Sequence, residues 1–474
     1  MKTMGLFGFF KKSGAGKKSA AKKANKQPSP KVIPRSEHSI SRRNISKAAL
    51  NVISGLHQGG FEGFLVGGGV RDLLLDQRPK DFDVATDATP EQVQKLFRNS
   101  RIIGRRFRIV HVRFGREVIE VTTFRGSHDA PLSGGQRKPD NQQSARSDNG
   151  MLLRDNVYGT VGEDAVRRDF TINALYYTTA DFSVHDFTNG VQDLEQKTIR
   201  IIGDAATRYR EDPVRMLRAV RFAAKLDFNI EAQTAAPIIE LAPSLGDISP
   251  ARMFDEALKL FMSGQGLATY QLMRHYHLFA PLFPQTERCL NDPFSNALVE
   301  QAMINTDLRI QAGKPVTPAF IFAALLWPAT SKRQQQLRND GMPEIPAMHQ
   351  AAQEVAGAQQ QHTSVPKRFG MPMREIWDLQ LRLPKRSGNR AEQLFENRRF
   401  RAAYDFLLLR EQAGEDTGGL GQWWTDYQNC SPDQRQQMSD AVKTPQSRKR
   451  PRKSSARRGG GGEKRPPEGG SGEV

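Results

Sequence analysis

The sequence predicts an α+β head with a small mixed sheet and helices, followed by an all-α neck and body, with disordered basic tails. Three observations support this fold class. Residues 40–200 mix period-two and helical patterns, whereas almost only helical periodicity follows residue 205. The net charge of +19 is concentrated at the ends of the chain. Residues 1–36 carry ten Lys/Arg and no acid, and residues 443–474 carry ten Lys/Arg against three Glu, so the part between them is nearly neutral.

The 474 residues suffice for several domains with a buried core. We divide them into an N-terminal tail (1–38), a head (39–204), a neck (205–265), a body (266–436) and a C-terminal tail (437–474). Both tails are rich in Gly, Ser, Pro, Lys and Arg, a composition that cannot bury a core and predicts disorder. The run RKRPRKSSARR (448–458) favours binding to a polyanion, above all nucleic acid, over a merely solvating tail.

Membrane insertion and disulfide bonding are both disfavoured. No stretch approaches the roughly 20 apolar residues that span a bilayer. The apolar run in GLFGFFKK (5–12) is too short for a signal peptide and its lysines follow it. We therefore expect no membrane span and a cytoplasmic location. Cys289 and Cys430 are the only cysteines and are not grouped with histidines, so neither a disulfide framework nor a zinc site is supported.

The head begins with an amphipathic helix in residues 39–60, which Gly59-Gly60 ends. Residues 61–86 then indicate a strand, a glycine turn, a short helix and a second strand. TPEQVQKLF (89–97) is a helix with Thr89 as N-cap, Pro at its first position and Gln at its third.

Residues 107–126 alternate around Gly115-Arg116 and predict a β-hairpin. A polar, Gly/Ser/Asn/Gln-rich stretch at 127–154 predicts a long loop, and 167–187 predict a helix followed by a strand. In the neck, 212–226 and 249–264 are helices with an N-cap and a following Pro. We find no internal repeat.

The chemistry is concentrated in LVGGGVRDLLL (65–75) and DFDVAT (81–86). Glycines after a strand let backbone N–H groups approach a phosphate at a helix N-terminus. Asp81 and Asp83, two residues apart on a strand, point to the same face, with Phe82 on the other. Two adjacent carboxylates raise each other's pKa unless a cation lies between them, and oxygen ligands beside a phosphate site suit Mg²⁺. The alternative is a surface strand whose aspartates face water.

These motifs resemble the polymerase-β-like nucleotidyltransferases, and more specifically the bacterial class II tRNA nucleotidyltransferase and poly(A) polymerase family. EVTTFR (120–125), RRDFTINAL (167–175) and EDPVRMLRAVRFAAKL (211–226) are similar to that family's later motifs, in order. The resemblance covers roughly residues 60–265. It implies a nucleotidyltransferase head that works with two Mg²⁺ ions, for which Mn²⁺ can substitute.

The resemblance assigns roles to individual residues. Asp81, Asp83 and Glu120 become the catalytic carboxylates and metal ligands, with an exposed strand glutamate as the alternative for Glu120. The residues that bind the nucleotide, including its phosphates and ribose, are implied to be Gly67, Gly68, Arg71, Asp72, Arg168, Asp169 and Asn173. The implied RNA-binding residues are Arg208, Arg218 and Arg221.

EDPVR (211–215) is implied to read the nucleobase and adds Glu211, Asp212 and Arg215 to the nucleotide site. Asp212 can accept from the exocyclic amine and Arg215 can donate to the ring nitrogen of either adenine or cytosine, so the motif excludes G and U without choosing between A and C. Asp212-Pro213 also reads as a helix N-cap, which is the structural alternative.

Two members of the family compete: enzymes that add poly(A) to RNA 3′ ends from ATP, releasing pyrophosphate, and enzymes that add CCA to tRNA. IIGRRFRIVHV (102–112) and residues 376–410 resemble the bacterial poly(A) polymerases, and no His-Asp hydrolase motif is present. Residues 367–410 hold eleven Lys/Arg against five Asp/Glu, which suits an RNA grip indifferent to sequence, although a solvated helix face explains it too.

We therefore expect a template-independent adenylyltransferase that promotes RNA turnover. Its expected partners are ATP, RNA 3′ ends and RNA-degradation proteins, and we expect a monomer. A non-catalytic RNA-binding protein is the third hypothesis, disfavoured because both Asp81 and Asp83 are present.

Overall fold

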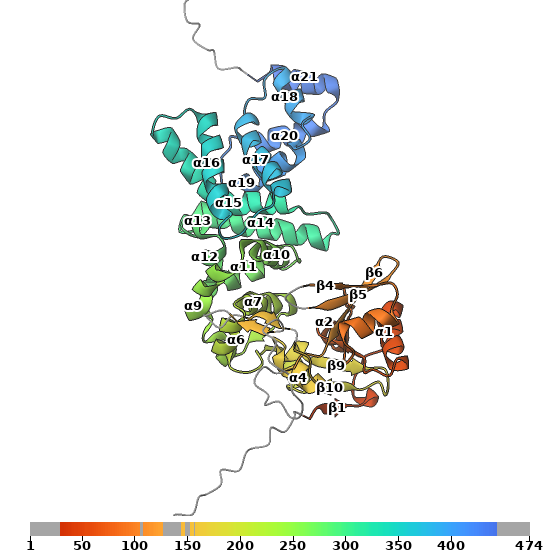
Figure 1. Cartoon of the computed structure of the whole chain (residues 1–474). Helices are drawn as coiled ribbons and strands as arrows, with labels where there is room; N and C mark the ends of the chain where they lie inside the picture. The colour runs from red at the N-terminus through yellow and green to blue at the C-terminus, as the bar shows by residue number, and fades with distance from the viewer. Residues whose placement is uncertain (1–28, 105–107, 127–143, 147–151, 156, 443–474) are drawn as a thin grey trace, which may run out of the picture.

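The computed structural model describes residues 29–104, 108–126, 144–146, 152–155 and 157–442 (Figure 1). Most of both predicted tails, including the basic run 448–458, and most of the predicted loop at 127–154 lie outside these residues. The described part is elongated: the sheet-containing head lies at one end, the helices of the neck follow, and the body lies at the other end (Figure 1).

The head is built on an eight-stranded sheet in the order β1-β10-β9-β2-β3-β6-β5-β4. Its strands are β1 (Lys31–Ile33), β2 (Phe64–Val66), β3 (Asp83–Thr86), β4 (Ser100–Ile103), β5 (Ile109–Phe114), β6 (Glu117–Thr123), β9 (Leu175–Thr178) and β10 (Val184–Asp186). β3 and β6 pair in parallel, and the other neighbours in this sheet pair antiparallel. The predicted mixed sheet is confirmed.

The sheet buries both of its faces, and the two faces differ in function. Val84 and Val121 face the main core, against which α1 (Lys47–Gln58) and α3 (Pro90–Leu96) pack. The opposite face holds a smaller cluster that includes Ala85 and Ala165 of α4 (Val161–Arg167). Because side chains alternate along a strand, Asp83 lies on this second face.

Local signals in the head act as the sequence predicts. Thr89 and Gln92 form a reciprocal capping box at the start of α3, with N–H to side-chain oxygen distances of 2.8 and 3.4 Å. The β5–β6 hairpin turns at Gly115, whose φ of +61° favours glycine. Short-range rules therefore place these elements without help from the rest of the chain.

The remaining helices of the head are short and lie beside the sheet. They are α2 (Gly68–Leu74), α5 (Gly190–Glu195) and the 3₁₀ turns η1 (Arg35–Glu37), η2 (Arg42–Asn44) and η3 (Thr171–Asn173). Two small sheets pair β7 (Ser144–Arg146) with β8 (Leu152–Asp155) and β11 (Thr198–Ile199) with β12 (Asn229–Ile230).

Apart from the two-residue strand β12 in the neck, the regular structure of the described neck and body is helical, as predicted. The neck contains α6 (Ala205–Glu211), α7 (Val214–Leu226), α8 (Ala232–Ala235), α9 (Ile238–Leu241), η4 (Ala242–Asp247) and α10 (Pro250–Phe261). The body contains α11 (Gly266–His275), α12 (Phe279–Leu282), α13 (Pro284–Glu287), α14 (Pro293–Gln311), α15 (Pro318–Asn339), α16 (Glu344–Gln359), α17 (Lys367–Arg382), α18 (Asn389–Phe395), α19 (Phe400–Gln412), α20 (Leu420–Asn429) and α21 (Pro432–Asp440). One core runs from the head through the neck into the body, and a second cluster around Trp424 lies at the far end.

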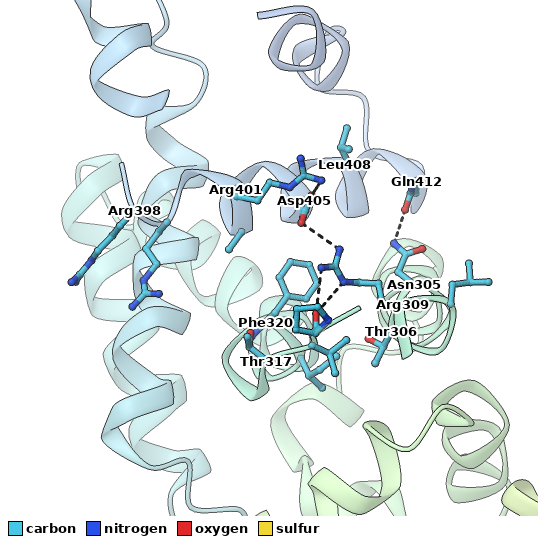
Figure 2. A pocket seen from close by; sticks show the side chains of 16 residues that line it. Asn305, Thr306, Arg309, Thr317, Phe320, Arg398, Arg401, Asp405, Leu408 and Gln412 are labelled. Atoms are coloured by element: carbon cyan, nitrogen blue, oxygen red, sulfur yellow. Dashed lines mark hydrogen bonds and ion pairs between the residues drawn. The ribbon is translucent and has the colours of Figure 1, made fainter. Parts of the chain in front are cut away.

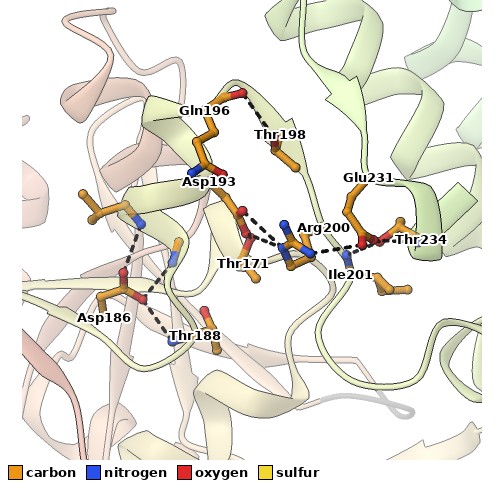
Figure 3. Close-up of polar contacts among 12 residues, drawn as sticks. Thr171, Asp186, Thr188, Asp193, Gln196, Thr198, Arg200, Ile201, Glu231 and Thr234 are labelled. Atoms are coloured by element: carbon orange, nitrogen blue, oxygen red, sulfur yellow. Dashed lines mark hydrogen bonds and ion pairs between the residues drawn. The ribbon is translucent and has the colours of Figure 1, made fainter.

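Polar contacts join the head to the neck beside η3 (Figure 3). Asp193 of α5 accepts from Thr171 Oγ1 at 2.6 Å and is paired with Arg200, which also reaches Glu231 at the start of α8. Asp186 accepts from three backbone N–H groups at the start of α5. These contacts hold η3 in place, and η3 carries residues of the predicted nucleotide site.

Four predicted boundaries differ from the structure. Residues 31–33 form edge strand β1 instead of belonging to a tail, because they pair with β10, a partner distant in sequence. At the other end, α21 extends to Asp440, beyond the predicted start of the C-terminal tail at 437. The predicted loop at 127–154 contains the β7–β8 pair. The sequence predicts a helix that begins at 167, whereas the observed helix α4 ends at Arg167 because the backbone of Arg168 is extended.

No helix among the described residues is both long and apolar enough to cross a membrane.

The packing of α5 on η3 generates a stability prediction. A side chain at Gly190 would collide with the Thr171 carbonyl oxygen, so Gly190→Ala should cost about 1–3 kcal/mol of unfolding free energy through overpacking. Gly357→Ala, in the last turn of α16 with nothing within 4 Å, is the matched control and should stabilise by about 0.4–1 kcal/mol. Urea unfolding followed by circular dichroism measures both; equal effects would contradict the packing.

Candidate active site

The glycine turn between β2 and α2 brings two predicted site residues together. Gly67 has φ +71° and ψ −139°, a conformation that favours glycine. A Cβ built there would lie 3.6 Å from Arg168 Nη1 and 4.0 Å from Asp83 Oδ2. The turn is therefore the point where a cation from the end of α4 and a carboxylate from β3 converge.

Asp83 and Glu120 are direct partners in the parallel β3–β6 pair, so their side chains start from the same face of the sheet. Burial raises the pKa of Asp83 to about 6, and the nearby negative charge of Glu120 adds to the rise while Arg168 opposes it. Burial is therefore the main reason that this carboxyl group resists ionisation, and the Glu120 carboxylate adds to it.

Asp81 is placed differently from the prediction. β3 begins at Asp83, so Asp81 precedes the strand, and its side chain is exposed. Phe82 and Val84 are buried, as expected for residues that plug the core side. The two aspartates are thus not equivalent: one is a half-buried strand residue and the other an exposed residue on the approach to it.

Among the described residues, no group of three or more His, Cys, Asp or Glu side chains is assembled as a metal site. Glu120 Oε1 lies 3.2 Å from His111 Nε2 on β5. The chemistry of the predicted set still fits a hard divalent cation, because it consists of carboxylate oxygens and because, after burial, the neighbouring carboxylate of Glu120 raises the pKa of Asp83.

Arg168 is held by a compact polar cluster on the same face of the sheet. Its Nε donates to Tyr176 Oη at 2.8 Å and to Asp164 Oδ2 at 3.2 Å, and Tyr176 Oη donates to the same Asp164 oxygen at 2.5 Å. Tyr176 and Asp164 raise the pKa of Arg168 against the effect of its burial. A permanently charged guanidinium is thereby positioned with Nη1 toward the Gly67 turn.

A buried chain of hydrogen bonds links the head to α7. Arg71 donates to Asp72 Oδ1 at 2.6 and 2.8 Å and to Asn173 Oδ1 at 2.7 Å. Asn173 Nδ2 donates to Asp169 Oδ1 at 3.2 Å, and Arg218 Nε of α7 donates to Asp169 Oδ2 at 2.6 Å. Although burial opposes it, Arg218 lowers the pKa of Asp169 to about 2, so this link stays ionised.

In this chain of hydrogen bonds, some residues that were predicted to bind the nucleotide are instead bonded to other side chains of the protein. Arg71 is only 2% exposed and each of its three guanidinium nitrogens has a hydrogen-bond partner. Its side chain therefore stabilises the glycine turn from the protein interior. Asp72 orients Arg71 and also lies 3.5 Å from Lys225 Nζ of α7. That the two residues bind a nucleotide stays a prediction.

The predicted base-reading residues lie at the junction of α6 and α7. Asp212 Oδ1 accepts from the backbone N–H of Val214 at 3.3 Å, a cap-like contact, and Asp212 Oδ2 accepts from Arg252 Nη2 of α10 at 2.8 Å. Arg215 Nη1 donates to Glu211 Oε2 at 3.0 Å. Each side chain is therefore braced by protein.

The predicted RNA-binding arginines differ in their surroundings. Arg208 donates to the carbonyl oxygens of Arg167 and Arg168 at 2.6 and 2.7 Å, so it ties the neck to the head. Arg221 has a buried Nε without a hydrogen-bond partner, and burial and then Arg218 lower its pKa to about 10. Arg208 likewise has a buried Nε without a hydrogen-bond partner, and burial and then Arg215 lower its pKa to about 10, but its other guanidinium nitrogens contact Glu211 and the two carbonyl oxygens.

Three guanidinium groups surround one aromatic ring at this place. Arg71, Arg218 and Arg221 lie 5.2, 5.2 and 4.5 Å from the ring centroid of Phe222 on α7. Phe222 is itself buried and edge-on to Phe170. The face of α7 toward the head is thus strongly basic, which suits a phosphate-rich ligand.

Sequence reasoning missed four residues of the site: Asp164, Tyr176, Lys225 and Arg252. The first two flank a quoted motif, and the alternation of β9 could have placed Tyr176 on the face of Asp83. Lys225 and Arg252 carry no local signal, because their partners are 153 and 40 residues away in sequence.

Known families match most of the chain. The model described as Poly A polymerase head domain matches residues 63–200, the probable RNA and SrmB-binding site of polymerase A matches 227–290, and the polymerase A arginine-rich C-terminus matches 340–458. Poly(A) polymerase I of Salmonella typhimurium is 48% identical over 455 residues, which cover 94% of this chain and 97% of that one.

More distant similarity reaches the CCA-adding enzymes. The enzyme of Lactobacillus helveticus is 38% identical over 226 residues, covering 47% of this chain and 52% of its own. The solved structure of the Bacillus stearothermophilus CCA-adding enzyme in complex with CTP has a TM-score of 0.53 at 25% identity, covering 80% of this chain and 81% of that one. The Thermotoga maritima enzyme complexed with tRNA, at 18% identity, covers 83% of this chain and 84% of its own with a TM-score of 0.54, and shows the shared fold.

The raised pKa of Asp83 predicts a pH-dependent stability. Since the folded carboxyl group holds its proton up to about pH 6 and the unfolded one only to about 3.8, its ionisation destabilises the metal-free fold increasingly between these values and fully above them. Asp83→Asn should therefore raise the melting temperature in EDTA at pH 8 by more than at pH 4.

The matched control is Asp81→Asn, at the exposed carboxylate two residues earlier, where we expect little change at either pH. Calorimetry at both pH values compares the variants. An equal gain from Asp83→Asn at pH 4 and pH 8 would contradict the interpretation.

Proposed function

Since this chain belongs to the bacterial poly(A) polymerase I family of nucleotidyltransferases, we propose that it adds AMP units to RNA 3′ ends at the site around Asp83. In each step, the RNA 3′-oxygen forms a bond to the α-phosphorus of ATP. The bond between that phosphorus and the bridging oxygen breaks, pyrophosphate leaves, and the 3′-hydroxyl proton passes to solvent. No template takes part.

The observation that carries this assignment is the convergence at Gly67. A bare backbone turn at the start of α2, the Arg168 guanidinium and the Asp83 carboxylate meet there, with Glu120 opposite on the neighbouring strand. Backbone N–H groups and a fixed positive charge suit the triphosphate. Carboxylates on the same face suit the cations that accompany it.

We propose that Asp81, Asp83 and Glu120 hold two Mg²⁺ ions, with Mn²⁺ as a substitute. When bound, the ions would lower the pKa of the 3′-hydroxyl and stabilise the charge on pyrophosphate. Asp83 is the donor best supported, because its carboxylate converges with Arg168 at the Gly67 turn and because, after burial, the neighbouring Glu120 carboxylate raises its pKa. Asp81 and Glu120 are exposed enough to turn toward the same ions.

Adenine is proposed to be read by Asp212 and Arg215. Asp212 accepts from the exocyclic amine and Arg215 donates to the ring nitrogen. Cytosine carries the same donor and acceptor as adenine, but as the smaller base it presents them at a different position. Arg252 limits where Asp212 can lie, since the two are 2.8 Å apart. Because Asp212 is held in one position, it can meet the amine of a purine or of a pyrimidine at that distance, but not of both.

The arginines beside the proposed site suggest where the RNA binds, and the proposed substrates suggest where in the cell the enzyme works. Arg218 and Arg221 on α7 lie at the edge of the proposed site and suit RNA phosphates. Because its proposed substrates are ATP and RNA 3′ ends, we place the reaction in the cytoplasm. We further propose that the enzyme works as a monomer and alongside RNA-degradation proteins.

The decisive assay extends a generic RNA, and a tRNA lacking its CCA end, with single nucleotides. Long tails made from ATP alone on generic RNA are expected. Addition limited to C, C and A on tRNA would instead indicate the CCA-adding activity of the more distant relatives.

Replacing either aspartate tests the catalytic assignment. Asp81→Ala and Asp83→Ala should each lower kcat at least about 10³-fold, as expected for loss of a ligand that stabilises the transition state. RNA affinity in gel-shift titrations should stay within about two-fold, since neither residue is placed on the RNA path. Retained extension would overturn the metal assignment.

Arg252 should act on nucleotide choice through Asp212. Arg252→Gln leaves Asp212 without its ion pair, so the KM for ATP should rise about five- to ten-fold and discrimination against CTP should weaken. Arg274→Gln, which removes an arginine paired with Glu287 in the body at 3.4 Å, is the matched control. Equal kinetics for the two variants would rule out this role.

A further inference from the structure

A pocket of about 520 Å³ lies in the body, and none of its lining residues belongs to the candidate active site (Figure 2). The C-terminal half of α14, the first turn of α15 and the helix α19 enclose it. Its volume falls within the roughly 300–1,000 Å³ typical of ligand pockets. The question is which ligand its lining would take.

The floor of the pocket is apolar and includes one well-held aromatic ring. Phe320 is half-buried and lies edge-on to the buried Phe406, with ring centroids 5.9 Å apart. Phe406 in turn lies edge-on to Trp327 at 5.3 Å. Val316 and Ala402 extend the apolar surface. A ring fixed in this way offers a rigid stacking platform.

The rim is strongly basic. Four arginines line the pocket against a single acid, Asp405. That acid is already engaged, because Arg401 lies 3.0 Å and Arg309 3.9 Å from its two oxygens (Figure 2). The side chains of Arg398 and Arg401 are 72% and 69% exposed, and each is paired with one carboxylate, Glu375 at 2.7 Å and Asp405 at 3.0 Å. Because such exposed ion pairs contribute little stability, a phosphate can replace the carboxylate as the partner of either arginine.

Two further features of the lining limit which class of ligand the pocket can bind. Thr317, the N-cap of the 22-residue helix α15, lines the pocket, so the positive end of that helix adds to the basic rim. Asn305 Nδ2 donates to Gln412 Oε1 across the pocket at 2.8 Å, and Asn305 Oδ1 accepts from Gln301, so the Asn305 amide is occupied by protein partners. The lining therefore suits an anion that carries a flat apolar face.

We propose that this pocket holds one nucleotide of the RNA substrate, upstream of the 3′ end, with its base on Phe320 and its phosphate on Arg398 and Arg401. Aromatic stacking combined with arginine contacts binds single strands with little regard to sequence. An acidic peptide would satisfy the rim but would leave its backbone groups unpaired on the apolar floor. The inference rests on the proposed function, which supplies the RNA.

The test measures the affinity of single-stranded RNAs of increasing length by fluorescence anisotropy. Wild-type protein should gain affinity once the RNA is long enough to reach the pocket. Phe320→Leu, and Arg398→Gln with Arg401→Gln, should each weaken long RNA about five-fold or more and leave the shortest RNA unchanged. The double variant should also lower the salt dependence of log affinity by roughly 1–2.

Arg333→Gln is the matched control, because Arg333 lies farther along α15, pairs with Glu354 at 2.6 Å and does not line the pocket. It should bind every length as wild type does. Glu375 keeps Arg399 when Arg398 is replaced, and Phe320→Leu keeps an apolar side chain, so melting temperatures should stay close to wild type.

Three outcomes would overturn the inference: length dependence that the variants leave intact, an equal loss for short and long RNA, or an acidic peptide that competes with RNA and whose binding the variants abolish. Failure of the proposed function would look different. In that case wild-type protein would extend no RNA with ATP, whatever the state of the pocket.

Discussion

The site depends on a buried chain of polar side chains that runs from the head into the neck: Asp72, Arg71, Asn173, Asp169 and Arg218. Each member satisfies the next, so none is a buried charge without a partner. Removing one would leave its neighbour unpaired, which typically costs about 3–5 kcal/mol. The chain is also geometric, because it fixes the glycine turn at one end relative to α7 at the other.

The pKa values of an acidic group on the sheet and of a basic group on α7 are both shifted toward the neutral form. On the sheet, burial and nearby carboxylates raise the pKa of Asp83. On α7, burial and neighbouring guanidinium groups lower the pKa of Arg221. Burial is the largest cause of both shifts, and like-charged neighbours add to it. The nucleoside triphosphate and metal ions that we propose for this site would bring a cation to the carboxylates and an anion to the arginines.

Local chemistry predicted well wherever neighbours in sequence decide the structure. The Thr89 capping box, the Gly115 hairpin and the Gly67 turn all follow from residues within a few positions. Prediction failed where a distant partner competes with local preference. The segment after Arg167 has helical spacing, yet its backbone is extended before η3, where Arg71, Asp193 and Arg218 hold its side chains.

By itself the sequence determined this protein's reaction type, through the resemblance of its ordered motifs to a known family. It also determined the mixed sheet and the helical body, because alternating and amphipathic periods are short-range properties. Only the tertiary structure decided which charges meet. Arg252 on Asp212, Lys225 on Asp72 and the arginines around Phe222 join segments that no local rule connects. Buried charges must find partners wherever the fold brings them, and that choice is made in three dimensions.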